Sequence, residues 1–92
     1  LLSLGSEGML GITKDQAILA KVPAVEAQST VGAGDSSLAG FLAAHIRGLS
    51  FDECVRLAAA YGTASVTDQS AELAYPNRAA EYYGRITITQ LQ

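Results

Sequence analysis

The stretch Ser29-Thr30-Val31-Gly32-Ala33-Gly34-Asp35-Ser36 decides the fold, because here a polar loop gives way to a helix. Two glycines flanking Ala33 permit a tight backbone path that exposes successive N–H groups. Those groups, with the positive end of the following helix dipole, attract an anion. The spacing alone leaves two interpretations open, an anion site with a carboxylate at its centre or a glycine turn whose Asp35 merely caps the helix.

A carboxylate directly beside a bound anion is the arrangement that phosphoryl transfer needs. In that interpretation the backbone of Gly32, Ala33 and Gly34 stabilises charge on the migrating phosphoryl group, and Asp35 accepts the proton of the attacking hydroxyl. Two other phosphate motifs fit less well. The sequence contains no Gly-x-x-x-x-Gly-Lys-Ser/Thr run, and Ser37 stands where a dinucleotide fingerprint requires its third glycine.

Upstream of this stretch the sequence predicts strands. Residues 1–4 are a largely apolar run that we expect to be a buried strand, and residues 5–8 form a polar, glycine-containing turn. Two more apolar runs, residues 9–13 and 17–22, flank the polar residues 14–16 and predict a β-hairpin.

Downstream of it the sequence predicts helices. The first runs from Ser36 to Gly48, a residue well suited to end it. Its apolar face has helical spacing and comprises Leu38, Phe41, Leu42, His45 and Ile46. The second begins at Ser50, which with Glu53 fits a capping box. Pro76-Asn77 starts a last short helix, and residues 86–89 alternate as in a strand. Strands followed by helices predict the α/β class.

Composition bounds the function classes. With 92 residues, 49% apolar and 16% charged, the chain fits one small globular domain or a piece of a larger one. Because Leu1 is not Met and lies in an apolar run, we expect a fragment. The net charge is −3 and the six basic residues are scattered, which argues against nucleic acid as a partner. No apolar run is long enough to predict a membrane span.

Single copies of cysteine and histidine restrict the site chemistry further. Cys54 alone cannot form an internal disulfide, and with one histidine, His45, the sequence supports neither a Ser-His-Asp triad nor a multi-histidine metal site. We therefore predict no protein metal ligands. A reducing cytoplasm is the expected location.

Residues 29–41 closely resemble the second signature of PfkB-type carbohydrate kinases, a Thr-x-Gly-Ala-Gly-Asp core followed by a small-residue helix with an Ala-Gly step. Upstream, Ser3-Leu4-Gly5-Ser6-Glu7-Gly8 is similar to the loop of that family that contacts ATP. Downstream, Arg56-Leu57-Ala58-Ala59-Ala60 resembles its alanine-rich helix beside the adenine. The three matches follow the family's order and span most of the chain.

The resemblance implies that residues 1–92 are the C-terminal, nucleotide-binding portion of a ribokinase-like kinase with a doubly wound α/β sheet, here with a β-hairpin and two main helices. Gly32, Ala33 and Gly34 would form the anion hole and Asp35 would be the base. The nucleotide-side loop would comprise Ser3, Gly5, Ser6 and Gly8. ATP and Mg²⁺ are the implied cofactors. The family's sugar-binding half and lid, through which members often form homodimers, have no counterpart here.

Departures from the pattern indicate a branch. Ser29 stands where many sugar kinases have an Asp that helps organise a monovalent-cation site, so potassium dependence is not implied. Ala59 stands where many members have Asn. Ser29-Thr30-Val31 instead resembles the branch acting on phosphorylated sugars. We expect phosphoryl transfer to fructose 1-phosphate, with minor-type 6-phosphofructokinase or tagatose-6-phosphate kinase as alternatives. A nucleotide-binding fragment, inactive alone, is the non-enzyme alternative.

Overall fold

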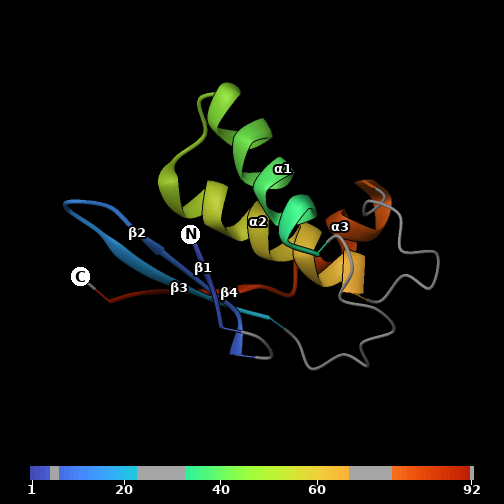
Figure 1. The fold of residues 1–92 in the computed structure, drawn as a ribbon, viewed down its shortest axis with the longest axis horizontal. Helices are drawn as coiled ribbons and strands as arrows, with labels where there is room; N and C mark the ends of the chain where they lie inside the picture. Colours follow the sequence, from blue (N-terminus) through green and yellow to red (C-terminus); the bar gives the residue numbers. More distant parts are fainter. Residues whose placement is uncertain (5–6, 23–32, 67–75, 92) are drawn as a thin grey trace.

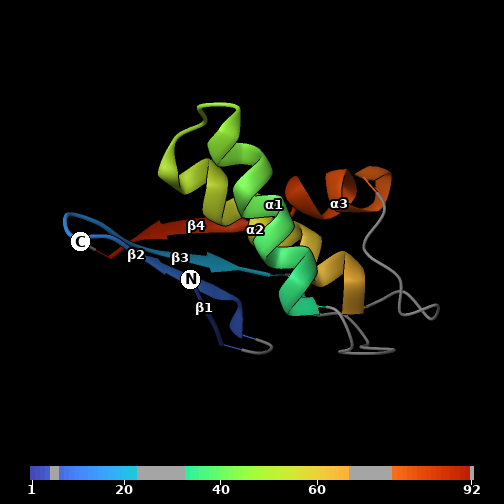
Figure 2. The same ribbon diagram turned by 45° about the horizontal axis from the view of Figure 1, so that its top comes forward.

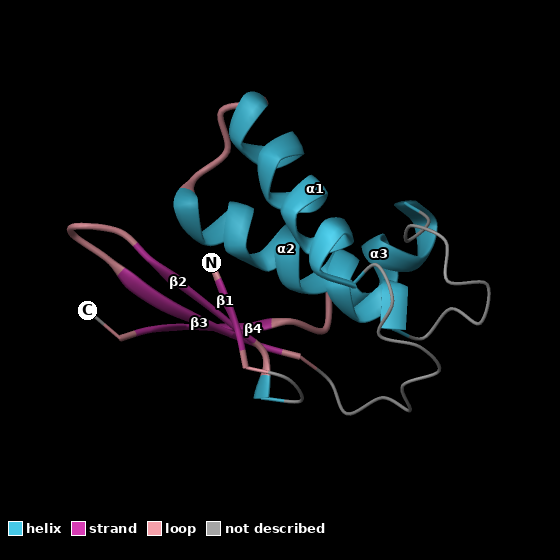
Figure 3. Cartoon of the chain, viewed as in Figure 1, coloured by secondary structure: helices cyan, strands magenta, loops and turns pink. Residues whose placement is uncertain are grey.

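The computed structural model contains a four-stranded sheet and three helices (Figures 1 and 3). It describes residues 1–4, 7–22, 33–66 and 76–91. In chain order the elements are β1 (Leu2–Ser3), β2 (Met9–Ile12), β3 (Ala17–Lys21), α1 (Ala33–Ile46), α2 (Phe51–Val66), α3 (Pro76–Tyr83) and β4 (Thr87–Gln90). The predicted α/β class, with a hairpin and two main helices, is confirmed.

The strands lie in the order β1-β2-β3-β4, and each neighbouring pair is antiparallel. The predicted hairpin is β2–β3, with Ile12 opposite Ala17. Its turn is closed by the Thr13 hydroxyl oxygen, which accepts hydrogen bonds from the backbone N–H groups of Asp15 (3.2 Å) and Gln16 (3.0 Å). This local bonding explains why the hairpin could be predicted from a short polar stretch.

The expectation of a buried first strand is wrong as to burial. Residues 2–3 form β1 and pair with β2, but Leu1 and Leu2 are more than half exposed. The sequence shows that these two residues are apolar, but not whether they are buried. What covers an edge strand, however, depends on which element lies beside it, and within the described residues β1 has a neighbour on one side alone.

The core lies between α2 and the sheet. Helices α1 and α2 lie on one face of the sheet, with α2 next to it (Figure 2). The buried apolar residues of this layer are Met9, Ile18, Ala20, Val55, Ala58, Ala59, Ala60 and Ile86. The contact is close at Gly11, where an added Cβ would lie 2.4 Å from Cγ2 of Val55. A side chain on β2 at this point would push the helix away from the sheet.

Helix α1 packs against α2 through small residues. A Cβ on Gly40 would lie 2.9 Å from the backbone oxygen of Leu57, and Ala44 is completely buried. The predicted apolar face of α1 is therefore wrong in its orientation: Leu38, Leu42, His45 and Ile46 are exposed, and Phe41 is half-buried. Small side chains form this interface because they let the two helix backbones approach closely.

The end of α1 and the starts of α2 and α3 lie where the sequence predicts them, but the side chains of the predicted capping box, Ser50 and Glu53, form other hydrogen bonds. Gly48 has φ +78°, and after it the N–H of Leu49 donates to the carbonyl of Ala44 at 3.1 Å, which closes α1. Helix α2 begins after Ser50, as predicted. The Ser50 hydroxyl, however, donates to the Asp52 carboxylate at 2.6 Å, and the Glu53 carboxylate accepts a hydrogen bond from Tyr83. Helix α3 begins at Pro76, as the sequence indicated.

Candidate active site

The first turn of α1 presents Asp35 to solvent. Helix α1 begins at Ala33, and Gly34 and Asp35 in its first turn are both exposed. The first N–H groups of any helix lack intrahelical acceptors, so a carboxylate and free donors occur together at this end. Apart from its chain neighbours and the backbone of its own helix, no atom of the described residues lies within 4 Å of the position that a Cβ on Gly34 would take. The surface at Gly34, next to Asp35, is therefore open among the described residues.

Buried serines orient this turn. Ser36 and Ser37 follow Asp35 directly and are almost completely buried. In the antiparallel pair of helices, the N-terminal end of α1 lies beside the C-terminal end of α2, where Thr63 and Ser65 are also buried (Figures 1 and 2). Because one side of the turn is anchored there, Gly34 and Asp35 face outward. The sequence motif contains both serines, but no local pattern indicates that they are buried.

The predicted nucleotide-side loop is described in part. Ser3 ends β1 opposite Met9, and Gly5 and Ser6 lie outside the described residues, as does Gly32 of the predicted anion hole. Gly8 is buried, has φ +115°, and a Cβ there would lie 2.1 Å from the carbonyl oxygen of Ala20. Its carbonyl accepts a 2.8 Å hydrogen bond from the N–H of Leu4. The fold alone thus requires glycine at this position, and nucleotide contact at the loop stays a prediction.

Cys54 is buried in α2 and has no reactive character. Burial, and secondly the charge of Asp52, raise the pKa of its thiol, so the thiol stays protonated near neutral pH. Within the described ranges, no three His, Cys, Asp or Glu residues are grouped so that they could hold a metal ion. None of the described helices combines the length and the apolar character that crossing a membrane requires.

The chain is similar in sequence to known carbohydrate kinases. A family model described as "pfkB family carbohydrate kinase" matches residues 1–78. A 1-phosphofructokinase of Rhodobacter capsulatus is 35% identical over 97% of this chain, and the ATP-dependent 6-phosphofructokinase isozyme 2 of Escherichia coli is 37% identical over 79%. The chain spans 28% and 24% of these two relatives.

A solved structure is also similar. Phosphofructokinase-2 from Escherichia coli, in complex with potassium, superposes with a TM-score of 0.86 and is 33% identical to the chain. The match covers 91% of this chain and 27% of that one. The chain therefore spans about a quarter of the length of this similar structure.

Proposed function

The chain belongs to the pfkB family of carbohydrate kinases, and from this premise we propose that it is the nucleotide-binding portion of an enzyme that transfers a phosphoryl group from ATP to a sugar phosphate. One observation carries the proposal. Asp35 is exposed in the first turn of a helix, directly after Gly34, whose surroundings are open.

In the proposed reaction Asp35 accepts the proton of the sugar hydroxyl as that oxygen attacks the γ-phosphorus of ATP. The bond between the γ-phosphorus and the bridging oxygen breaks, and ADP leaves. The proposed anion hole is the backbone N–H groups of Gly32, Ala33 and Gly34, which donate to the phosphoryl oxygens as charge shifts during transfer. The open space beside Gly34 fits an anion at this point. Ser3, Gly5, Ser6 and Gly8 are the proposed contacts on the nucleotide side.

ATP is proposed to arrive with Mg²⁺, which neutralises phosphate oxygens when bound. Asp35 is the acidic residue in the first turn of α1. A single carboxylate does not make a metal cage of its own, so the metal would be held largely by the nucleotide. The chain's own contribution is then to orient the phosphates and to hold the base.

Fructose 1-phosphate is the proposed acceptor. Ser29-Thr30-Val31 resembles the branch acting on phosphorylated sugars, and the relative from Rhodobacter capsulatus, a 1-phosphofructokinase, aligns with 97% of the chain. Fructose 6-phosphate is the first alternative, since the relative from Escherichia coli is a 6-phosphofructokinase. Tagatose 6-phosphate is the second. We place the enzyme in the cytoplasm, where ATP and sugar phosphates are available.

We propose that the remainder of the enzyme lies beside β1. Within the described residues, strand β1 is an edge strand, and Leu38 and Leu42 of α1 are exposed. Further strands beside β1 would cover these leucines and complete the doubly wound sheet. We therefore assign residues 1–92 to the C-terminal portion and expect them to be inactive alone. A homodimer through the family's lid belongs to the same proposal.

The test replaces Asp35 in the complete protein. Asp35→Asn is expected to lower turnover about 10²- to 10⁴-fold, because the general base is lost. ATP affinity should stay within a few-fold. Turnover is measured as ADP release with ATP–Mg²⁺ and each of the three sugar phosphates, in potassium and in sodium buffer. Asp15→Asn, in the exposed turn of the hairpin, is the matched control and should be fully active.

The outcomes separate the candidates. Near-normal turnover by Asp35→Asn would remove the base assignment. Turnover with a free sugar alone would keep the family and change the branch. A complete protein that binds ATP but releases no ADP with any acceptor would favour the second candidate, a nucleotide-binding module without catalysis. The exposed N-terminal turn of α1 supports that candidate equally well.

A further inference from the structure

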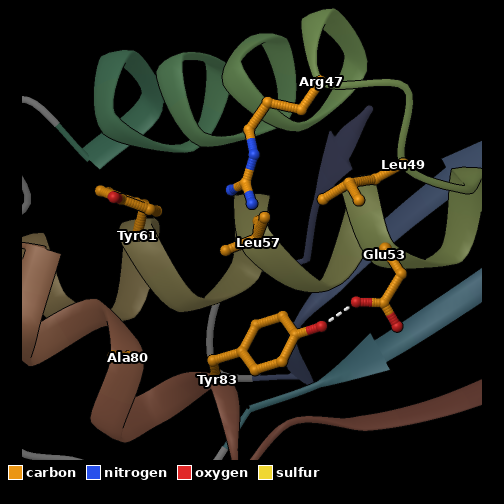
Figure 4. Close-up of a pocket in the computed structure, with 7 residues that line it drawn as sticks. All are labelled: Arg47, Leu49, Glu53, Leu57, Tyr61, Ala80 and Tyr83. Atoms are coloured by element: carbon orange, nitrogen blue, oxygen red, sulfur yellow. Dashed lines mark hydrogen bonds between the residues drawn. The ribbon is translucent and has the colours of Figure 1, made fainter.

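A groove of about 450 Å³ lies at the other end of α1, between the turn that follows this helix, α2 and α3 (Figure 4). Its apolar walls come from Leu49, Leu57 and Tyr61. The volume lies within the range of roughly 300 to 1,000 Å³ typical of small-molecule sites. The groove therefore has the size and the largely apolar lining of a ligand site.

The groove contains one cation whose charge is not neutralised within it. The Arg47 side chain extends from the end of α1 toward α2, and its guanidinium group lies between Tyr61 and Leu49 (Figure 4). The one carboxylate among the described residues that line the groove, that of Glu53, is hydrogen-bonded to Tyr83. An arginine fork of this kind binds carboxylate or phosphate through two parallel hydrogen bonds.

The carboxylate of the groove is already engaged. Glu53 accepts a hydrogen bond from the hydroxyl of Tyr83, which lies across the groove on α3 (Figure 4). The Tyr83 ring is in turn contacted by Arg56, whose guanidinium carbon is 5.2 Å from the ring centroid. These contacts tie α2 to α3 and hold Glu53 away from Arg47. Among the described residues, the groove thus presents a cation without a carboxylate partner, beside apolar and aromatic walls.

We propose that this groove binds a small organic anion that carries one carboxylate or phosphate group beside an aromatic or branched apolar body. The oxyanion would bind Arg47, and the apolar body would lie against Leu49, Leu57 and Tyr61. Neither the oxyanion nor the apolar body alone would give tight binding. An exposed guanidinium holds a bare anion weakly, and a shallow apolar wall orients a ligand poorly.

This site is separate from the candidate active site. Asp35 lies in the first turn of α1 and Arg47 just beyond its last turn, 12 positions later. At 1.5 Å per residue this separation is about 18 Å. A ligand in the groove would not reach the reacting atoms, so the inference does not depend on the proposed kinase activity.

The test measures binding of benzoate, phenyl phosphate and benzyl alcohol to the complete protein by isothermal titration, with ATP–Mg²⁺ present to occupy the nucleotide site. We expect at least one of the two anions to bind, and benzyl alcohol, which lacks the charge, to bind at least tenfold more weakly. Arg47→Gln should lower the affinity for the anion at least tenfold. Arg85→Gln is the matched control, because Arg85 also lies beside a tyrosine ring, that of Tyr82, and is not a lining residue of the groove.

A second variant keeps Arg47 in place. Ala80 lines the groove from α3 and is exposed, so Ala80→Glu should fold normally and repel the anion. Weakening by both Arg47→Gln and Ala80→Glu, with Arg85→Gln unchanged, supports the site. Binding of one anion alone identifies the preferred oxyanion. Binding that is unaffected by both groove variants, or no binding of either anion by the wild-type protein, overturns the proposal.

Discussion

Helices α1 and α2 are similar in length, 14 and 16 residues, but they have opposite surroundings. Helix α2 lies between the sheet and α1, and its buried positions run from Cys54 to Ser65 along most of its length. Helix α1 is covered on one side, by α2. Its large apolar residues Leu38, Leu42 and Ile46 are about half exposed or more.

This difference means that α2 stabilises the fold, whereas α1 carries the candidate site residue Asp35. The packing between α2 and the sheet is made of residues that this chain supplies itself, so it holds the described fold together. Helix α1 uses its small face to dock onto α2 and presents its N-terminal turn, with Asp35, to solvent. Asp35, the proposed base, therefore lies on an exposed helix end and not in the closely packed layer.

The largest expected effect compares a buried residue of α2 with an exposed residue of α1. Val55→Ala should destabilise the protein by about 2 kcal/mol, because Val55 is completely buried and its methyl groups leave a cavity. Leu42→Ala should cost under about 0.5 kcal/mol in the 92-residue chain, since Leu42 is 46% exposed. Urea unfolding measures both.

The same two substitutions, Val55→Ala and Leu42→Ala, can also be compared in the complete protein. If further strands cover α1 as proposed, Leu42→Ala should there cost about 2 to 5 kcal/mol, the usual cost of a buried Leu→Ala change. An equally small cost in the complete protein would show that α1 keeps an open face and would contradict the proposed position of the missing strands.

A second prediction compares two glycines within α1. Gly40→Ala should destabilise by about 1 to 2 kcal/mol, because its Cβ would lie 2.9 Å from both the Leu57 backbone oxygen and Cδ2 of Tyr61. Gly34→Ala, where nothing lies within 4 Å, should instead stabilise by about 0.5 to 1 kcal/mol through helix propensity. Thermal unfolding distinguishes them, and shifts of the same sign would refute the close contact at Gly40.

The smallest expected effect concerns the link between α2 and α3. Tyr83→Phe removes the hydroxyl that donates to the Glu53 carboxylate and should cost about 1 kcal/mol, since the pair is partly buried. Tyr61→Phe is the control and should change stability by less than about 0.5 kcal/mol. Equal unfolding midpoints for the two variants would mean that the hydrogen bond contributes no net stability.

Local chemistry was predictable from the sequence wherever neighbours in the chain make the bonds. The hairpin closed by Thr13 and the helix end at Gly48 are of this kind. The helix predicted from Ser36 begins three residues earlier, at Ala33, so Gly34 and Asp35 lie in its first turn and not in a loop before it. The base and the anion hole remain predictions. Their residue types and order carried the family resemblance that the family model then showed independently.

The orientation of α1 was decided by the tertiary structure. Periodicity identifies which residues are apolar, but burial depends on the surface that each face meets, and here Gly40 and Ala44 fit closer to α2 than leucine could. The hydrogen bond from Tyr83 to Glu53 joins residues 30 positions apart, and no local pattern encodes it. The sequence by itself therefore determined the elements, the family and the candidate base, because these depend on local spacing and residue type. Only packing decided which faces are buried and where Arg47 meets its groove, because those properties depend on distant parts of the chain.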